Sequence, residues 1–223
     1  MAAAGDVPPE DSKLTRTKRK WAAEGRGLTG HVARPETERL PPGQHLVRDW
    51  PVLDLGQHPA VAPEDWRLVI GGAVENPLVW GWDSFQRQPQ SRMTSDIHCV
   101  TTWSRYDNRW EGVATRDLLD IVMPKTDAGF VALHGYDGYT TNLTIEDFAS
   151  DQALLAHSWE GRPLSREHGA PVRLVVPHLY FWKSAKWLRQ IDFLAKDAPG
   201  FWEVNGYHNR GDPWREERYS GGA

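Results

Sequence analysis

The chain contains one cysteine, Cys99, among 223 residues, which excludes several ways of holding a fold together. A single thiol cannot form an internal disulfide, a CxxC redox pair, a cysteine-rich zinc site or a self-contained iron–sulfur site. Cys99 is therefore a buried core residue, a nucleophile, or one thiolate ligand of a metal whose other ligands come from elsewhere. The polar neighbours His98, Thr101 and Thr102 weaken the core interpretation, because a reactive or metal-bound thiolate needs donors nearby. A soft thiolate also suits a transition metal.

The composition is that of a globular protein, with 39% hydrophobic and 25% charged residues. A net charge of −4 gives no signal for a nucleic-acid partner. Twelve tryptophans suggest a packed core together with walls around a sizeable ligand. No apolar run approaches the roughly 20 residues that cross a bilayer, and the first residues resemble neither a secretory signal nor a twin-arginine signal. We therefore expect a cytoplasmic protein without a membrane span.

The chain is expected to divide near residue 45. Residues 1–45 are rich in Ala, Gly, Pro and charge, which predicts a poorly ordered arm, whereas residues 46–223 carry the apolar segments of one domain. The basic run Lys13 to Lys20 fits a solvated tail better than a site for an anionic partner.

The folded part reads mainly as strands. Apolar or alternating segments predict strands at 65–74, 95–103 and 170–177, and a hairpin of 129–135 with 139–145 around Asp137–Gly138. Two helices are predicted, one over 114–122 with Thr115 as N-cap and a short one capped by Thr144. Residues 187–195 alternate like a strand, with a helix as the alternative. The expected fold class is therefore α+β, a mostly β mixed domain with curved sheets and short helices.

A second group of chemically suggestive residues lies between 168 and 187. Arg173 begins an apolar strand, and Lys183, Ser184 and Lys186 follow in a turn, a combination that suits an anion such as a phosphate. The alternative is an exposed basic turn, but the flanking tryptophans argue against full solvation. His134 and His168 are ambiguous singly, and no histidine pair has the spacing of metal ligands.

Three ordered segments together resemble a known family. They are DIHCVTTWSRYDNRWEGV, EHGAPVRLVVPHLYFWKSAKWL and GFWEVNGYHNRGDPWREERY. Over about residues 40–219 the chain is similar to the sulfite oxidase family, above all to its short bacterial molybdopterin-dependent oxidoreductases. The catalytic subunit of the bacterial methionine-sulfoxide reductase is a more distant relative.

The resemblance implies the sulfite oxidase molybdopterin-binding fold and a molybdenum atom held by the dithiolene of one molybdopterin and by the Cys99 thiolate. It also implies that Arg173 and the turn from Lys183 to Lys186 contact the pterin and its phosphate. His168 and His134 correspond less closely to contact residues of the family. The expected cofactor-binding residues are Arg173, Lys183, Ser184, Ala185, Lys186, His168, His134, His98 and Thr101. His98, Thr101 and Thr102 would steer the substrate or tune the thiolate.

The expected activity is oxygen-atom or two-electron transfer on a small-molecule substrate. An S-oxide or N-oxide reductase, a non-catalytic molybdopterin-binding module and a cofactor-free scaffold are the alternatives. True sulfite oxidases follow their cysteine with an Ala-Gly-Asn-Arg-Arg type sequence, and VTTW stands here, with Arg105 and Arg109 out of register. The resemblance therefore does not extend to the sulfite site. A chain of this length is expected to be too short for the haem domain of animal sulfite oxidases, so the resemblance implies a separate electron-transfer partner.

Overall fold

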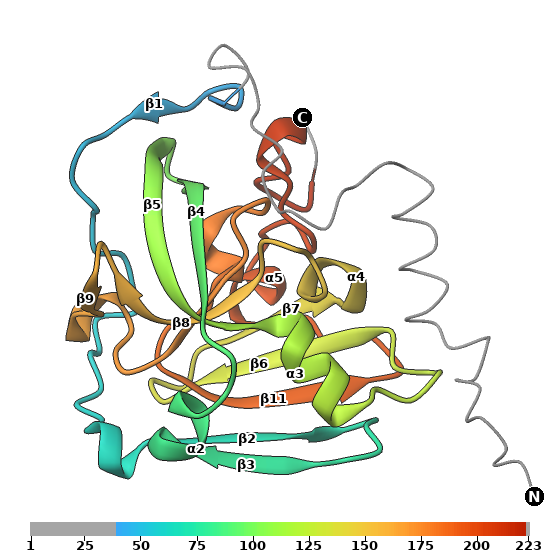
Figure 1. Ribbon diagram of the computed structural model, residues 1–223. Coiled ribbons are helices and arrows are strands. Elements are labelled where there is room, and N and C mark those ends of the chain that lie inside the picture. Colours follow the sequence, from blue (N-terminus) through green and yellow to red (C-terminus); the bar gives the residue numbers. More distant parts are fainter. Residues whose placement is uncertain (1–38, 222–223) are drawn as a thin grey trace, which may run out of the picture. The chain divides into compact units, whose positions relative to one another are not determined.

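Two β-sheets dominate the computed structural model, which describes residues 39–221 (Figure 1). The first sheet has six strands, in the order β1-β5-β8-β10, with β4 paired to β5 and β9 paired to β8. These strands are β1 (His45–Leu46), β4 (Ser91–His98), β5 (Trp103–Ala114), β8 (Leu154–Trp159), β9 (Arg162–Pro163) and β10 (Arg173–Val175). The antiparallel β4–β5 pair is the long ribbon in Figure 1, and the segment with Cys99 forms its end. The strand expected at 95–103 thus ends one residue before Cys99.

The second sheet has five strands in the order β3-β2-β11-β6-β7. They are β2 (Arg67–Gly72), β3 (Leu78–Gly81), β6 (Phe130–Gly135), β7 (Thr140–Thr144) and β11 (Leu188–Leu194). Alternation sets its two faces, since Leu68, Ile70, Ile191 and Phe193 are buried between more exposed neighbours. The structure confirms the β6–β7 hairpin and resolves residues 187–195 as a strand.

The helices are short and lie between strands. They are α2 (Trp82–Gln86), α3 (Thr115–Val122), α4 (Ile145–Phe148) and α5 (Phe201–Val204), with single 3-10 turns η2 (Pro63–Asp65), η3 (Arg166–His168), η4 (Phe181–Lys183) and η5 (Pro213–Arg215). The mostly β mixed fold is therefore confirmed.

The caps of two helices test local predictions. The Thr144 hydroxyl accepts from the Asp147 N–H at 3.1 Å, so its capping role is confirmed. The prediction for Thr115 is wrong, because Ala114 is the N-cap and Thr115 is the first helical residue. The buried Thr115 hydroxyl instead donates to the carbonyls of Phe148 and Ala153, tying α3 to the segment before β8.

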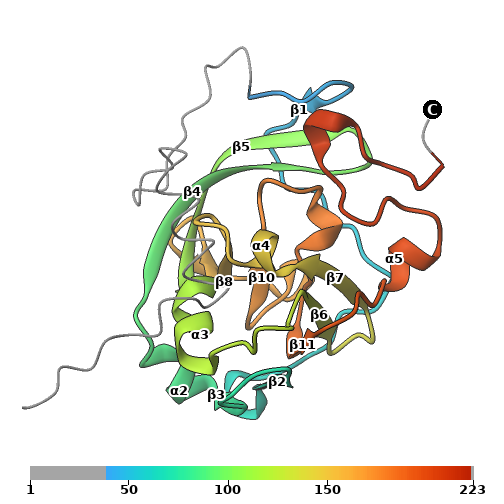
Figure 2. The ribbon, with the colours of Figure 1, turned by 90° about the vertical axis from the view of Figure 1, so that its right-hand side faces the viewer.

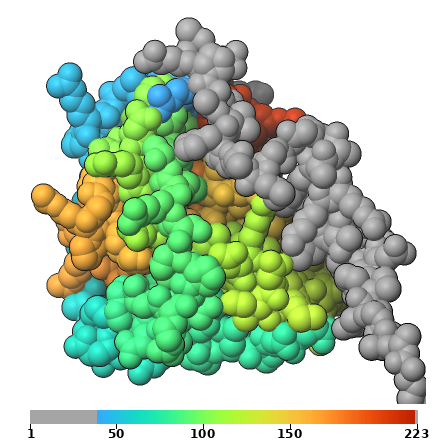
Figure 3. All heavy atoms as spheres, in the orientation of Figure 1, coloured from blue at the N-terminus to red at the C-terminus, as the bar shows by residue number. Residues whose placement is uncertain are grey.

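The first described residues lie against the β4–β5 ribbon. Arg39 forms ion pairs of 2.6 Å with Asp96 and with Asp107, and β1 pairs with β5 in parallel. Figure 3 shows this blue segment beside the light green surface of β5. The arm predicted for residues 1–45, with its basic run, lies mostly outside the described residues, and its boundary stays a prediction. Over residues 39–221, no helix is long and apolar enough to cross a membrane.

Candidate functional site

Cys99 begins a tight turn between β4 and β5. Its N–H donates to the Trp103 carbonyl at 2.8 Å, and its carbonyl accepts from the Thr102 N–H at 3.0 Å. Thr102 has a φ of 78°, which is unfavourable for a β-branched residue. The turn thus holds a strained backbone next to the only thiol, as functional loops often do.

The Cys99 side chain is buried at 7% exposure, and its sulfur lies 3.1 Å from the Thr101 hydroxyl. Burial raises the pKa of the Cys99 thiol, while the Thr101 hydroxyl and the positive charge of Arg218 act in the opposite direction. The sulfur therefore needs a further positive partner, such as a metal ion, to be held as a thiolate.

His98 belongs to a hydrogen-bond network that supports this turn. Its Nδ1 lies 2.8 Å from the Ser104 hydroxyl, which donates to Gln44 Oε1 at 3.2 Å. Gln44 Nε2 in turn donates to the Cys99 carbonyl at 3.1 Å. His98 and Ser104 thus orient Gln44, and Gln44 orients the Cys99 backbone.

Arg173 is a cation buried at 2% exposure without a carboxylate partner among the described residues. Its guanidinium donates to the carbonyls of His168 at 2.9 Å and Ser184 at 2.8 Å. The guanidinium also lies 4.4 Å from the centre of the Phe181 ring. Burial lowers the pKa of Arg173 to about 9. A buried charge held only by carbonyls and aromatic rings favours a bound anion that compensates it.

Lys186 and the turn before it lie beside Arg173. Lys186 Nζ contacts Asp54 at 3.1 Å and the Glu167 carbonyl at 2.9 Å. Burial first, and the charge of Arg173 second, lower the pKa of Lys186 to about 8, against the opposing effect of Asp54. Within residues 39–221, the N–H groups of Ala185 and Lys186 donate to no acceptor, so they remain available to an anion.

The close packing of this turn requires a glycine. Gly169 has a φ of +106°, and a Cβ there would lie 3.0 Å from the Lys186 Cβ and 3.2 Å from the Arg173 Cβ. Gly169 therefore lets the Arg173 and Lys186 stems approach each other.

His168 packs inside the same region. Its ring stacks on Trp50 at 3.8 Å between centroids, Nδ1 lies 2.9 Å from the Ser165 hydroxyl, and Nε2 lies 3.2 Å from the Trp50 carbonyl. Burial and the nearby Arg173 lower the pKa of His168, which favours a neutral ring.

Ser184 and Ala185 support the turn, whereas Lys183 points elsewhere. The Ser184 hydroxyl accepts from the Val176 N–H at 2.9 Å, and the Ala185 carbonyl accepts from the Leu174 N–H at 2.9 Å. Lys183 is fully buried, with Nζ 2.6 Å from Glu203 Oε1. The structure therefore brings Arg173, Ser184, Ala185 and Lys186 together, and it commits the Lys183 ammonium to a different partner.

His134 lies in β6 of the second sheet. Its Nε2 is 3.1 Å from Asp192 Oδ2, without hydrogen-bond geometry. The described contacts of the ring connect it to β11 and to neither Cys99 nor Arg173.

Cys99 and Arg173 both adjoin one aromatic cluster. Cys99, Trp50, Tyr180 and Phe181 belong to the same set of packed buried residues. The Arg173 guanidinium lies over the rings of two members of this cluster, Trp50 and Phe181. The sequence patterns identified the thiol and the basic turn, but no local signal marked Trp50.

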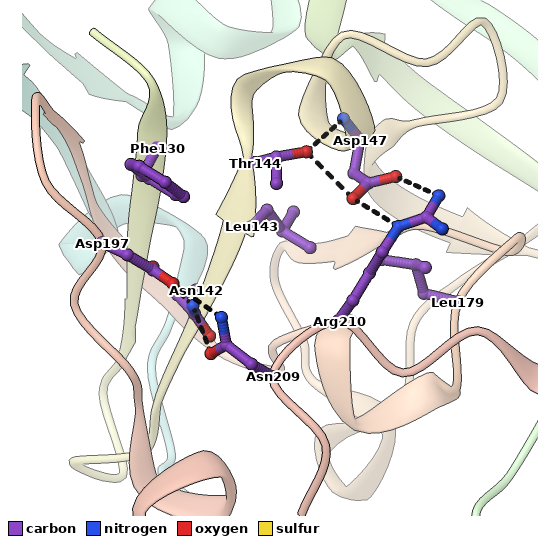
Figure 4. A pocket seen from close by; sticks show the side chains of 9 residues that line it. All are labelled: Phe130, Asn142, Leu143, Thr144, Asp147, Leu179, Asp197, Asn209 and Arg210. Atoms are coloured by element: carbon purple, nitrogen blue, oxygen red, sulfur yellow. Dashed lines mark hydrogen bonds and ion pairs between the residues drawn. The ribbon is translucent and has the colours of Figure 1, made fainter. Parts of the chain in front are cut away.

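A small pocket elsewhere holds the C-terminal segment to β7 (Figure 4). Asn142 donates to Asp197 at 2.6 Å and to Asn209 at 2.9 Å, and Arg210 contacts Asp147 at 3.2 Å. The polar side chains that line the pocket are thus bonded to one another. They attach the C-terminal segment to β7 and do not form an open binding site.

The donors fit a molybdenum cofactor of the pterin type. One thiol is present, and in the described part of the chain no group of three His, Cys, Asp or Glu side chains could hold a metal alone. Such a metal therefore needs ligands brought by an organic molecule. Arg173, Lys186 and two unused N–H groups supply the positive counterpart of an anionic phosphate.

Comparison with known proteins agrees with this donor set. Residues 55–202 match the family described as the oxidoreductase molybdopterin binding domain. The uncharacterized oxidoreductase YuiH of Bacillus subtilis is 46% identical over 188 residues, which cover 83% of this chain and 94% of that protein.

Two further comparisons are more distant. The catalytic subunit MsrP of the protein-methionine-sulfoxide reductase of Campylobacter jejuni is 27% identical over 157 residues, or 63% of this chain, and the match spans about half (52%) of that protein. The structure of the sulfane dehydrogenase SoxCD of Paracoccus pantotrophus superimposes with a TM-score of 0.58 at 21% identity, covering 86% of this chain and 60% of that chain, which supports the fold.

The family match, the relatives and the fold confirm the resemblance to sulfite oxidase-like oxidoreductases, whose cofactor is molybdenum bound to molybdopterin. The buried thiol of Cys99 and the buried Arg173, which has no carboxylate partner among the described residues, suit such a cofactor. The chain therefore belongs to the oxidoreductase molybdopterin binding domain family.

Proposed function

We propose that the Cys99 sulfur ligates the molybdenum of a bound molybdopterin and that the enzyme transfers an oxygen atom, or two electrons, to or from a small substrate. The observation that carries the proposal is that one aromatic cluster contains the only thiol and lies under Arg173, a buried cation without a carboxylate partner in the described residues. A thiol within an aromatic cluster, and a buried cation over two rings of the same cluster, suit a cofactor with a metal at one end and a phosphate at the other.

Each residue of the site has a distinct task in this proposal. Arg173, Lys186 and the N–H groups of Ala185 and Lys186 bind the anionic end of the cofactor, while Ser184 holds the turn. Trp50 packs against the Arg173 side and limits access of water. When bound, the cofactor supplies a metal that accepts or donates an electron pair together with an oxygen atom. Cys99 fixes the metal, and Thr101, at 3.1 Å from the sulfur, contributes a hydroxyl beside it.

A separate electron-transfer protein is part of the proposal, because two-electron chemistry at one metal needs a donor or acceptor to complete the cycle. The cytoplasmic location stays a prediction.

The test is metal and pterin analysis of protein purified from a host that makes the cofactor. We expect molybdenum and extractable pterin in the unmodified protein, and loss of activity in Cys99→Ser. Arg173→Met is expected to lower pterin content, whereas Arg162→Met, at an exposed position of β9, is not. Full activity of Cys99→Ser would refute the ligand assignment, and unmodified protein without molybdenum would favour a cofactor-free scaffold.

Reduction of an S-oxide or N-oxide is the second candidate. It rests on the aromatic and positively charged surroundings of Cys99, where Tyr180, Trp182 and Tyr207 pack in one cluster and Arg218 lies over Tyr180. Aromatic faces suit the sulfur of a thioether, and a cation suits the strongly dipolar oxygen of its oxide. A relative named for methionine-sulfoxide reduction supports the same class.

A substrate screen separates these reactions. With an artificial electron mediator, we expect turnover with S-oxides or N-oxides and none with sulfite. A cofactor signal that no substrate changes would instead favour a non-catalytic binding module.

A further inference from the structure

The carbonyl groups of the turn that carries Cys99 accept hydrogen bonds from two parts of the chain that are distant in sequence. The Cys99 carbonyl accepts from the Gln44 side chain at 3.1 Å, and the Thr102 carbonyl accepts from the His45 N–H at 2.9 Å. Between them, the Val100 carbonyl accepts from Arg218 Nη1 at 2.6 Å. The segment before β1 and the end of the chain thus both fix the backbone of the thiol turn.

Arg218 also connects these two segments to each other. Its Nη2 lies 3.4 Å from the Pro42 carbonyl, and its guanidinium lies 5.0 Å from the centre of the Tyr180 ring. A Cβ at Gly43 would come within 3.2 Å of Arg218 Nη2, so this contact is close. Figure 2 shows the red C-terminal segment beside β1 and the start of β5, where the turn lies.

The charge of Arg218 has no carboxylate within ion-pair distance in the described part of the chain. Because the Arg218 guanidinium binds the carbonyl of Val100, the residue directly after Cys99, its positive charge lies beside the thiol turn. The arginines that follow Cys99 more closely are engaged elsewhere: Arg105 Nη1 donates to Asn108, and Arg109 forms a 2.7 Å ion pair with Glu160.

We propose that Arg218 is a positioning residue of the metal site, which fixes the Cys99 turn through the Val100 carbonyl and raises the reduction potential of the bound metal through its charge. The inference rests on the proposed function, because it takes Cys99 as the metal ligand. Groups that contact a ligand's backbone or adjust the charge around a metal typically change metal affinity and potential.

The positive charge of Arg218 determines the direction in which it shifts the midpoint potential. The reduced metal centre carries more negative charge than the oxidised one, so a nearby cation stabilises the reduced state. Removing the cation should therefore lower the midpoint potential. Breaking the hydrogen bond to Val100 should loosen the turn and reduce the amount of metal retained.

The experiment compares Arg218→Gln and Arg218→Lys with Arg215→Gln in the cofactor-loaded enzyme. Arg215 is a matched control because it lies in the same segment, with its side chain 69% exposed and only a 3.7 Å ion pair to Glu217. The readouts are the midpoint potential from a redox titration followed by electron paramagnetic resonance, molybdenum per protein, and kcat with KM. Thermal melting reports whether each variant is folded.

We expect Arg218→Gln to lower the midpoint potential and to retain about tenfold less molybdenum or worse, by analogy with other residues that orient metal ligands. Arg218→Lys should keep the potential nearer to that of the unmodified enzyme, since it keeps the charge, while still losing metal. If Arg218→Gln does not fold, Arg218→Lys decides, and unchanged metal content in that variant would overturn the positioning role.

Equal potentials in the unmodified enzyme, Arg218→Gln and Arg215→Gln would overturn the electrostatic role. Failure of the proposed function has a different signature, since the unmodified protein would then contain no molybdenum.

Discussion

Replacing Lys183 with methionine tests whether this lysine stabilises the fold or binds the cofactor. Lys183 is fully buried, and its ammonium contacts Glu203 at 2.6 Å, the Asn142 side chain at 2.8 Å and the Asn142 carbonyl at 2.9 Å. Methionine keeps the approximate length of the side chain but removes the charge. The Glu203 carboxylate would then remain buried with only the neutral donors Thr141 and Trp182, both at 2.9 Å.

The magnitude follows from the geometry of the pair. Removing one partner of a buried ion pair costs about 3–5 kcal/mol, because it leaves the other charge uncompensated. For a chain of this size, each kcal/mol lowers the melting temperature by about 2–4 °C, so we expect a decrease of about 6–20 °C. The double variant Lys183→Met with Glu203→Gln removes both charges and should recover at least half of the lost stability.

Urea unfolding and thermal melting measure these differences in the unmodified protein, Lys183→Met and the double variant. Lys196→Met, at an exposed lysine after β11, is the control. The control should change the free energy of unfolding by less than about 0.5 kcal/mol. A loss below about 1 kcal/mol in Lys183→Met, combined with a large loss of pterin, would refute the structural role and favour direct cofactor binding.

Three further predictions concern the thiol turn, an ion-pair network and the anion cradle. Thr102→Gly relieves a φ of 78° while keeping the backbone bonds of the turn, so the free energy of unfolding in urea should rise by about 1 kcal/mol; a decrease would show that the position is not strained. Burial alone would raise the pKa of Asp147, but hydrogen bonds from His178 and Arg210 bring it well below its usual value. Because the folded-state pKa is depressed, the resulting stabilisation is complete above about pH 4 and is lost as the pH falls, and Asp147→Asn should flatten that acid dependence in urea unfolding at several pH values. Lys186, with its pKa lowered to about 8, is charged below that pH, so pterin retention during dialysis should fall as the pH rises through 8; a similar fall in Lys186→Met would contradict this origin.

The local structure of the chain was largely predictable. The β6–β7 hairpin and the cap at Thr144 depend on residues that are neighbours in sequence, so turn and capping chemistry identified them. The exception was Thr115, whose hydroxyl turned away from its helix because distant buried carbonyls were available to it.

The sequence by itself determined which chemical groups the protein has for its site: one thiol, a strand that begins with arginine, and a basic turn. Only the tertiary structure decided how these groups are used. Lys183 and Lys186 are three residues apart, yet Lys183 contacts Glu203, whereas Lys186 contacts Asp54 and lies beside Arg173. Arg218 reaches the thiol turn from the end of the chain. Local patterns set helices and strands because they act between sequence neighbours, whereas the partner of a buried charge is set by which distant segments the packed sheets bring into contact.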